Sequence, residues 1–354
     1  MNKRYRKIVI GISVIIFMML LNGMLFNMNR RLNEQEEEAG AGDVITIGFS
    51  QIGAESDWRT ANSISMKETF SEEKGYDLIF ANAQQKQQNQ IMAIRSFIQQ
   101  EVDYIVLVPG TETGWDTVLR EARDVGIPVI VVDRKVDVED ESLYTSWVGA
   151  DFQLEGEKLC EWLQDYVQKR KIKEVNIAHI QGTIGASAQI GRTEALNEAA
   201  QTYGWNIVSQ QSGEFTQARA QEVMEAMLQQ YPDINVVYCE NDNEAFGVIE
   251  AIEAAGKTVG PDGDIMVVSF DATNNGLTKV MQGEILVDVE CNPLHGPRVE
   301  QIIVQLEEGK IPEKDNYVQE EIFAYSDEIP SLEVEGITYK VTEVTEELIR
   351  KRPY

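Results

Sequence analysis

Several segments of this sequence place carboxylate, amide and guanidinium side chains directly after short apolar runs of the kind that form buried strands. These segments are Gln51 to Arg59, Asp133 with Arg134, Gln181 to Ser187, Glu240 to Asn243, Asp271, and Glu290 to Asn292. Such groups can bond two neighbouring hydroxyls at once, so they suit vicinal diols. Trp58 adds an apolar face for the C–H side of a sugar ring.

Each of these residues also has a simpler explanation, because Asp and Asn directly after a strand often cap the next helix. Helix capping accounts well for any one position taken alone. It accounts less well for the whole set, since six strand ends carry such groups. In open parallel sheets, ligands bind outside the carboxyl ends of the strands. The sequence therefore predicts a polar binding site at these ends.

From Asp43 onward, short β-branched runs alternate with amphipathic stretches, which is typical of parallel sheets covered by helices. Two successive series of this kind predict two similar α/β lobes. The predicted strands cover 44–50, 76–82, 103–109, 128–133, 175–181, 205–211, 235–240, 264–270 and 285–290. The predicted helices cover 58–73, 86–100, 113–125, 151–169, 186–203, 217–230, 243–256, 276–282 and 296–308.

The charge distribution excludes some classes of partner. The chain has 354 residues and a formal net charge of −28. Residues 1–42 carry a net charge of +2, so the rest of the chain carries −30. A body this acidic repels phosphate backbones and anionic lipid surfaces, which excludes nucleic acid as a partner.

The N-terminal segment predicts the compartment. An apolar run of 19 residues, Ile8 to Phe26, follows the basic cluster Lys3 to Lys7. A membrane-spanning helix needs about 20 apolar residues, whereas a signal-peptide core has about 7–15. The flanking basic residues favour a cytoplasmic N-terminus and an exterior body. We expect residues 1–28 to be an uncleaved transmembrane anchor, with a cleaved signal as the alternative, and residues 29–42 to be a charged linker.

Several motifs together resemble a known family. The segment GFSQIGAESDWR, residues 48–59, resembles the opening of bacterial periplasmic sugar-binding proteins of the ribose/galactose class, and within it the galactofuranose-binding subgroup. The resemblance continues, in order and with matching spacing, over residues 43–325. It includes QQKQQNQ (84–90), VDR (132–134), QGTIGAS (181–187) with Arg192, QSGEFT (211–216), Asn241-Asp242 and SFD (269–271).

The resemblance implies the fold of a type I periplasmic binding protein. Two Rossmann-like lobes would be joined by a hinge of three crossovers and would close on one sugar. The crossovers would lie near 148–151, 271–273 and 310–313. The first lobe would combine residues 43–148 with 273–311, and the second lobe residues 149–272 with 312–354. The predicted fold class is therefore α/β, preceded by an N-terminal transmembrane or signal helix.

The resemblance also implies which side chains contact the ligand, and these agree with the chemistry of the strand ends. Aspartate and glutamate would accept from hydroxyls, arginine would donate bidentately, asparagine would do both, and tryptophan would pack on the ring. The implied ligand-binding residues are Trp58, Arg59, Asp133, Arg134, Arg192, Asn241, Asp271 and Glu290, with Gln51, Glu55 and Asp151 in a second tier.

Two features depart from the family pattern and leave the identity of the sugar open. Glu240 stands where relatives more often have His or a small residue. Cys291-Asn292 replaces the usual apolar–polar pair before Pro293. The segment 324–354 is also longer than the resemblance implies, with a strand-like stretch at 337–341 and a helix-like stretch at 343–350.

A glycosidase is the minor alternative. Asp133 and Asp271 would make an acid–base pair if one of them held a proton, but we expect neighbouring arginines to keep both ionised. His179 fits core packing and His295 fits helix capping. Three Cys and two His predict no metal site and no disulfide framework. We expect no enzymatic activity and no cofactor.

Two receptor functions remain open. One delivers a monosaccharide to the permease of an ABC transporter, and the other presents the bound state to a membrane histidine kinase. A lactose-repressor-like regulator would share the lobes but needs a basic DNA-binding domain where this chain has its apolar run. We expect an extracytoplasmic, monomeric ectodomain, held at the cell membrane by the N-terminal helix, or periplasmic or secreted if that helix is cleaved.

Overall fold

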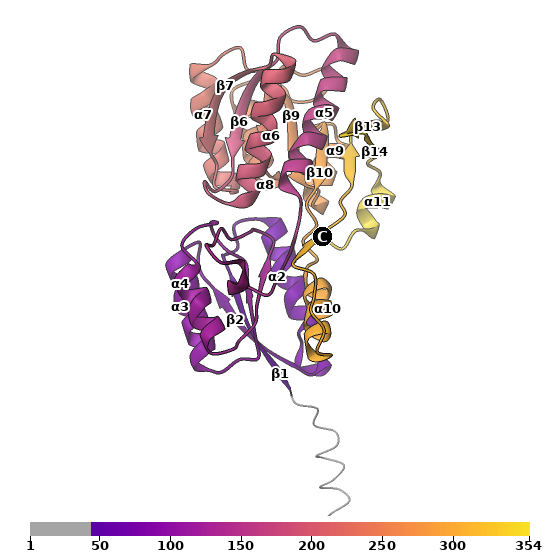
Figure 1. Cartoon of the computed structure of the whole chain (residues 1–354). Helices are drawn as coiled ribbons and strands as arrows, with labels where there is room; N and C mark the ends of the chain where they lie inside the picture. Colours follow the sequence, from indigo (N-terminus) through magenta and orange to yellow (C-terminus); the bar gives the residue numbers. More distant parts are fainter. Residues whose placement is uncertain (1–43) are drawn as a thin grey trace, which may run out of the picture. The chain divides into compact units, whose positions relative to one another are not determined.

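The computed structural model describes residues 44–354. From Thr46 to Tyr354 they form one compact unit, which contains two α/β lobes with one main sheet each (Figure 1). The predicted N-terminal anchor and charged linker, residues 1–28 and 29–42, lie outside the described residues. Within residues 44–354, no helix combines the length and the apolar composition that crossing a membrane requires.

The first lobe contains a six-stranded sheet with helices on both faces. Its short central strands are buried along their whole length, as expected for Val- and Ile-rich strands covered on both sides. The strand order is β2 (Tyr76–Asn82), β1 (Ile45–Gln51), β3 (Tyr104–Leu107), β4 (Val129–Val132), β5 (Ser146–Gly149) and β11 (Asp315–Tyr317). The helices are α2 (Asp57–Thr69), α3 (Gln87–Gln99), α4 (Asp116–Asp124) and α10 (Gly296–Glu307), with 3-10 turns η1 (Glu72–Lys74) and η2 (Glu141–Leu143).

The second lobe contains an eight-stranded sheet. Its strand order is β7 (Asn206–Ser212), β6 (Asn176–Gln181), β8 (Val236–Cys239), β9 (Met266–Asp271), β10 (Val287–Glu290), β12 (Ile322–Ala324), β14 (Ile337–Glu343) and β13 (Ser331–Val334). The helices are α5 (Phe152–Arg170), α6 (Ser187–Tyr203), α7 (Gln217–Gln230), α8 (Asp242–Ala254), α9 (Asn274–Met281) and α11 (Glu346–Lys351). The order from β7 to β10 repeats the order from β2 to β5, so the two predicted similar lobes are confirmed.

Three crossovers connect the lobes. The first, residues 150–151, joins β5 to α5 and agrees with the prediction. The second, residues 291–295, joins β10 to α10, and the third, residues 318–321, joins β11 to β12. All three are loops between elements that belong to different lobes, so each lobe is discontinuous in sequence.

The predicted positions of the second and third crossovers are wrong. The chain does not return to the first lobe near 271–273, because β10 pairs in parallel with β9, with Asp288 opposite Ser269. Strand, helix and strand from β9 to β10 form one βαβ unit, and such a unit stays in one sheet. Residues 274–290 therefore belong to the second lobe, and the third crossover follows β11 rather than preceding it.

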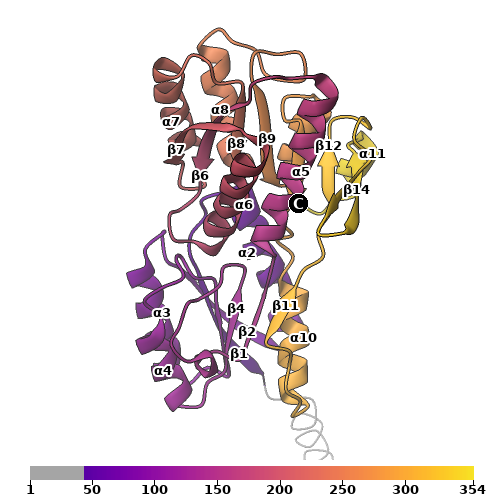
Figure 2. The ribbon, with the colours of Figure 1, turned by 45° about the horizontal axis from the view of Figure 1, so that its top comes forward.

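Hydrogen bonds also join the lobes away from the crossovers. The amide of Asp57 donates to Asn243 Oδ1 at 2.9 Å, and Asn275 Nδ2 donates to Asp57 Oδ2 at 2.7 Å. The amide of Lys135 donates to Ser187 Oγ at 2.9 Å. The start of α2 and the loop after β4 thus bond helix N-termini of the second lobe, so the two lobes seen in Figure 2 are in direct contact.

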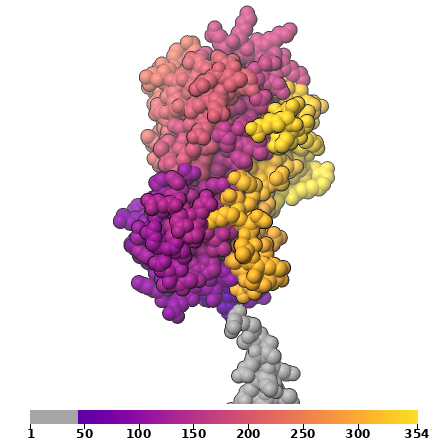
Figure 3. Space-filling model, in the orientation of Figure 1, coloured from indigo at the N-terminus to yellow at the C-terminus, as the bar shows by residue number. Residues whose placement is uncertain are grey.

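The long C-terminal segment completes the second lobe. Strand β14 pairs in parallel with β12 and antiparallel with β13. Leu332, Val334 and Val341 join the buried cluster that also contains Trp162 of α5. In the space-filling view this yellow segment lies against the second lobe, while the orange segment with α10 covers the first (Figure 3). The segment is therefore an integral part of the fold.

Packing of α8 on α7 depends on a close approach at Gly247. A Cβ there would overlap the backbone oxygen of Gln217 and lie 2.9 Å from the amide nitrogen of Gln221. We predict that Gly247→Ala lowers the free energy of unfolding by about 1–3 kcal/mol, because the two helices must separate. Urea denaturation measures this. Glu253→Ala, at an exposed position of the same helix, is the control, and an equal effect of both substitutions would contradict the prediction.

Candidate functional site

The first turn of α2 supplies one wall of the site. Ser56 is the N-cap, and its Oγ accepts from the amide of Arg59 at 3.1 Å. This turn directs both Trp58 and Arg59 inward, where each is buried. Arg59 Nε donates to Glu55 Oε1 at 2.9 Å, and Arg59 Nη2 donates to Asp133 Oδ2 at 2.7 Å. These ion pairs fix the guanidinium before any ligand arrives.

The end of β4 supplies the next pair of side chains. Asp133 has φ of 64°, in the left-handed region that costs a non-glycine residue about 1–2 kcal/mol. Trp147 Nε1 donates to the backbone oxygen of Asp133 at 2.9 Å, which helps to hold this turn. Arg134 Nη1 donates to the carbonyl of Gly110 at 3.1 Å, and its guanidinium lies 5.1 Å from the ring centre of Phe215 in the second lobe.

Arg192 of α6 is the main cation of the second lobe. Its Nε donates to Glu155 Oε2 at 2.8 Å, and its Nη2 lies 3.9 Å from Asp271 Oδ1. The guanidinium also lies near two aromatic rings, 5.5 Å from the centre of Phe152 and 4.6 Å from the centre of Phe270. Bonds and ring contacts together hold this side chain in a buried position.

Glu240, which departs from the family pattern, supports Arg192 from behind. Its backbone oxygen accepts from Arg192 Nη1. Its carboxylate accepts from His179 Nε2 at 2.9 Å and from the amide of Gly182 at 2.7 Å. Both His179 and Glu240 are fully buried. Glu240 thus has a structural role, because it holds His179, Gly182 and Arg192 in one hydrogen-bond network.

Asn241 serves as a helix cap and also lines the site. Its Oδ1 accepts from the amide of Glu244 at 2.8 Å at the start of α8, and its Nδ2 donates to the carbonyl of Phe215 at 3.3 Å. The capping explanation weighed from the sequence therefore holds for Asn241. It does not exclude a second role, because the same side chain faces the space between the lobes.

These side chains surround a small cavity between the lobes. It is lined by seven of the eight predicted ligand-binding residues and by Glu55 of the second tier. Among the described residues, Glu55 Oε2, Arg59 Nη1 and Arg134 Nε are buried without a hydrogen-bond partner. Buried polar atoms are normally paired, so a polar ligand would complete these groups. The lining residues are Glu55, Ser56, Trp58, Arg59, Asp133, Arg134, Phe152, Ala188, Arg192, Phe215, Asn241, Asp271 and Cys291.

The two aspartates of the cavity differ in their affinity for a proton. Burial alone would raise the pKa of Asp133, but two neighbouring arginines outweigh it and hold this pKa below its usual value. At Asp271 burial prevails over the attraction of Arg192, and with Asp242 nearby the pKa lies well above its usual value. Arginine neighbours therefore do not hold the pKa of Asp271 below its usual value as they do at Asp133, because Arg192 is already paired with Glu155. Of the two carboxyls, Asp271 is the one that takes up a proton more readily.

Two residues predicted as second-tier contacts have other partners. Gln51 Nε2 donates to Asn62 Oδ1 at 2.9 Å and so links β1 to α2. Asp151 is the N-cap of α5, and its Oδ1 accepts from the amide of Leu154 at 3.1 Å. Neither lines the cavity. Their place next to the site reflects their structural roles at strand and helix ends.

Glu290 is the predicted ligand-binding residue that the structure does not bring to the cavity. Its Oε1 accepts from Arg352 Nη2 at 2.9 Å and from the hydroxyl of Tyr354. Its Oε2 accepts from the amide of Glu321 at 2.8 Å. The strand-end pattern could not reveal this, because the partners lie in the last residues of the chain and in the third crossover.

The sequence prediction missed the aromatic residues of the lining other than Trp58. Phe215 has φ of 60° and follows Glu214, whose φ is 58°. This pair of left-handed residues turns the Phe215 ring toward the site. Phe152 directly follows the first crossover at the start of α5. The only signals in the sequence were the QSGEFT motif for Phe215 and the helix start for Phe152.

His295, in the second crossover, supports Trp58 and introduces a dependence on pH. It is buried, its ring lies edge-on to Trp58 at 5.8 Å, and its Nδ1 accepts from Asn62 Nδ2 at 3.1 Å. Burial lowers the pKa of His295 from 6.5 to about 3, although the carboxylate of Asp133 opposes this. Between about pH 3 and pH 6.5 this histidine therefore binds a proton in the unfolded chain but not in the folded protein. The contribution of neutral His295 is therefore fully present above pH 6.5 and is lost as pH falls.

We predict that His295→Gln flattens the pH dependence of the free energy of unfolding between about pH 4 and pH 6. The slope of the free energy of unfolding against pH should fall by up to about 1.4 kcal/mol per pH unit, which corresponds to the uptake of one proton on unfolding. Urea denaturation at a series of pH values measures it. Carboxyl groups titrate in both proteins, so the difference between the two slopes isolates His295. Equal slopes would show that this imidazole titrates normally.

Comparisons with known proteins agree with this geometry. A family model described as a periplasmic binding protein domain matches residues 47–289. The galactofuranose-binding protein YtfQ of Escherichia coli is 40% identical over 275 residues, which are 76% of this chain and 85% of that protein. A solved structure from Mycobacterium smegmatis in complex with β-D-fucofuranose is 42% identical, with a TM-score of 0.76 over 79% of this chain and 91% of that one. The binding protein of the arabinose ABC transporter from Shewanella sp. ANA-3, bound to α- and β-L-arabinofuranose, is 40% identical, with a TM-score of 0.74 over 80% and 92%. The chain therefore belongs to the periplasmic binding protein family.

Proposed function

We propose that this protein is an extracytoplasmic receptor that captures one monosaccharide in its furanose form and delivers it to an ABC transporter. The observation that carries the proposal is the cavity between the lobes, where charged groups from both lobes meet aromatic rings. Three relatives, at 38–42% identity, are named for galactofuranose or solved with fucofuranose or arabinofuranose, which supports the furanose ring. One of these relatives is a component of an ABC transporter, which supports delivery.

The lining of the cavity suits the chemistry of one sugar ring, because charged hydrogen-bonding groups and aromatic rings lie side by side in it. Ionised Asp133 would accept from two hydroxyls, and the unpartnered N–H groups of Arg59 and Arg134 would donate to ring or hydroxyl oxygens. Trp58 and Phe215 would cover the apolar faces of the sugar.

The separated pKa values of Asp133 and Asp271 are also those of an acid–base pair, which keeps a glycosidase as a second candidate. The two functions differ in what happens to the sugar. A receptor returns it unchanged, whereas a glycosidase releases an aglycone. Incubation with a chromogenic furanoside distinguishes them, and product released in step with protein concentration would overturn the receptor proposal.

We also propose that the N-terminal segment anchors the receptor in the membrane, and a sensor function is the alternative to transport. The 19-residue apolar run favours an anchored receptor, and the first cysteine is Cys160, so the N-terminal region offers no cysteine for lipid attachment. An anchored receptor fits either a permease or a histidine kinase as its membrane partner. Intact-mass measurement of protein extracted from membranes tests the anchor. Loss of residues 1–28 would contradict it and leave sugar capture unaffected.

We predict that Asp133→Asn weakens sugar binding about ten- to a hundredfold, because it removes a charge-assisted hydrogen bond worth about 1.5–3 kcal/mol. Isothermal titration calorimetry with galactofuranose, arabinose, fucose, galactose and ribose measures this. Glu290→Gln is the matched control, since the carboxylate of Glu290 accepts from Arg352 and does not line the cavity. The sugar affinity of this variant should stay within about twofold of that of the unchanged protein. Failure of the folded protein to bind any of these sugars would overturn the receptor proposal.

We predict that Asn243→Ala also weakens sugar binding, by about two- to tenfold, although Asn243 does not line the cavity. Its Oδ1 bonds the amide of Asp57 only when the lobes are closed. Removal of that bond makes the free energy of lobe closure less favourable by about 0.5–1.5 kcal/mol, and the free energy of sugar binding changes by the same amount. Asn197→Ala is the control, because Asn197 bonds Gln210 within the second lobe. Unchanged affinity in Asn243→Ala would contradict binding by closure.

A further inference from the structure

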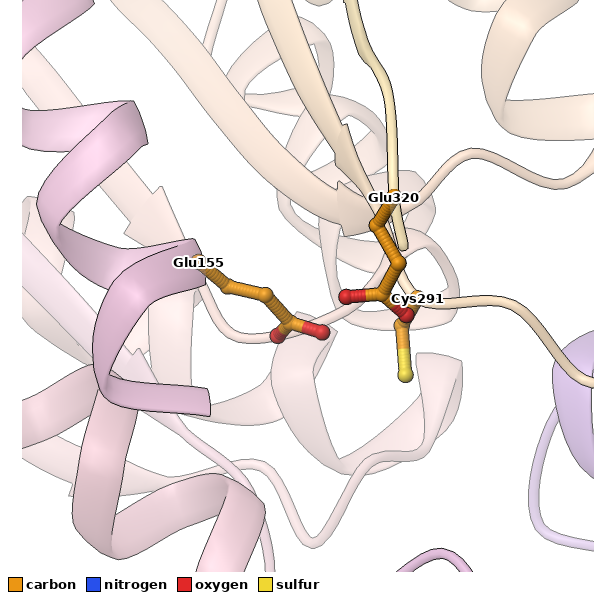
Figure 4. A group of neighbouring side chains, drawn as sticks. All are labelled: Glu155, Cys291 and Glu320. Carbon is orange, nitrogen blue, oxygen red and sulfur yellow. The ribbon is translucent and has the colours of Figure 1, made fainter. Parts of the chain in front are cut away.

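Beside the sugar cavity, three side chains with metal-ligand chemistry lie close together: Glu155, Cys291 and Glu320 (Figure 4). One ligand atom from each lies within 4.8 Å of the other two. Glu155 and Cys291 are buried, and Glu320 is partly exposed. The described residues contain no other group of three His, Cys, Asp or Glu side chains with this spacing.

The three residues come from the three connections between the lobes. Glu155 lies in the first turn of α5, directly after the first crossover. Cys291 begins the second crossover, and Glu320 lies in the third. An ion bound to all three would therefore tie the hinge together at the point where its three chains meet.

One atom of the cluster lacks a partner. Glu155 Oε2 accepts from Arg192 Nε at 2.8 Å, but Glu155 Oε1 is buried and has no hydrogen-bond partner within residues 44–354. Figure 4 shows the carboxylates of Glu155 and Glu320 turned toward each other, with the side chain of Cys291 beside Glu320. Glu320 Oε1 accepts from the amide of Asn292 at 2.8 Å, which fixes that carboxylate. A fully buried carboxylate oxygen is thus aimed into the cluster, and it has no donor there unless the two carboxyls share a proton.

The cluster also has more acidic groups than cations. Arg192 is the cation that bonds Glu155, and it lies near Asp271 as well. Two carboxylates that face each other in a largely buried place repel unless a proton or a cation lies between them. A divalent ion bound to two carboxylates and one thiolate leaves a single negative charge, which the guanidinium of Arg192 balances.

We propose that Glu155, Cys291 and Glu320 form a binding site for a divalent cation of the zinc type. A thiolate ligand favours zinc over magnesium or calcium, which take oxygen ligands. Zinc–sulfur distances of about 2.3 Å and zinc–oxygen distances of about 2.0–2.2 Å place tetrahedral ligands about 3.3–3.6 Å apart. The ligand atoms of the cluster, which lie within 4.8 Å of one another, would therefore approach by up to about 1 Å through side-chain rotation. Water on the exposed side of Glu320 would complete the coordination. On binding, the thiol proton of Cys291 passes to solvent.

Zinc titration of the purified full-length protein without sugar, in competition with a chromophoric chelator, tests the site. We expect one zinc per chain, bound at least tenfold more weakly by Cys291→Ser and by Glu320→Gln. Cys160→Ser is the matched control, since Cys160 is a buried cysteine of α5 in the core of the second lobe, and its zinc affinity should not change. Cobalt in place of zinc should give a thiolate-to-metal absorption band that Cys291→Ser abolishes.

No stoichiometric zinc binding, or binding that neither substitution weakens, would overturn the proposal. Circular dichroism of each variant confirms that it is folded. If Cys291→Ser does not fold, Glu320→Gln decides the outcome, because this side chain is partly exposed and the substitution preserves its size. The test contains no sugar, so its failure and the failure of sugar binding are separate results.

Discussion

Three buried guanidinium groups, those of Arg59, Arg134 and Arg192, lie at the carboxyl ends of the two sheets, and each must find acceptors there. A buried charge that loses its partner costs several kcal/mol. This requirement explains why the connections around the site are so constrained. Asp133 adopts a left-handed turn that brings its carboxylate to Arg59, and Ser56 caps the helix that carries Arg59. Arg59 and Arg134 each keep a buried N–H group without an acceptor within residues 44–354, and a ligand can bond these groups.

The charged groups of the two lobes are balanced differently where the lobes meet. In the first lobe Glu55 and Asp133 balance Arg59 and Arg134, and the two arginines hold the pKa of Asp133 below its usual value despite burial. In the second lobe Glu155 and Asp271 share Arg192, and burial raises the pKa of Asp271 despite that guanidinium. Both lobes therefore present guanidinium and carboxyl groups to the space between them. Closure brings these together, and a polar ligand between them bonds groups of both kinds.

The sequence predicted most of the fold for a physical reason. Long buried strands and amphipathic helices have a clear period, and their predicted bounds differ from the observed ones by a few residues. The strands β5, β11, β12 and β13 were missed, because each has only three or four residues and none contains a run of four apolar residues like those of β3 and β4. The second crossover was misplaced because hinge and loop look alike in sequence. Only the pairing of β10 with β9 assigns residues 274–290 to a lobe.

Most of the residues of the candidate site could also be predicted from the sequence. Polar residues at the ends of parallel strands gather at one edge of each sheet, and the cavity between the lobes is lined from both edges, by Asp133 of the first sheet and Asp271 of the second. Glu290 did not follow this rule, because Arg352 and Tyr354 bind its carboxylate. The cluster of Glu155, Cys291 and Glu320 could not be predicted, since its members come together only through the hinge. Spacing along the chain carries no information about such a contact.

The strand order has a consequence for how the molecule is made. The first sheet is completed by β11 and the second by β12, β14 and β13, all from the last part of the chain. During synthesis neither sheet can gain these strands until nearly the whole polypeptide has left the ribosome. Neither lobe can therefore complete its sheet far ahead of the other.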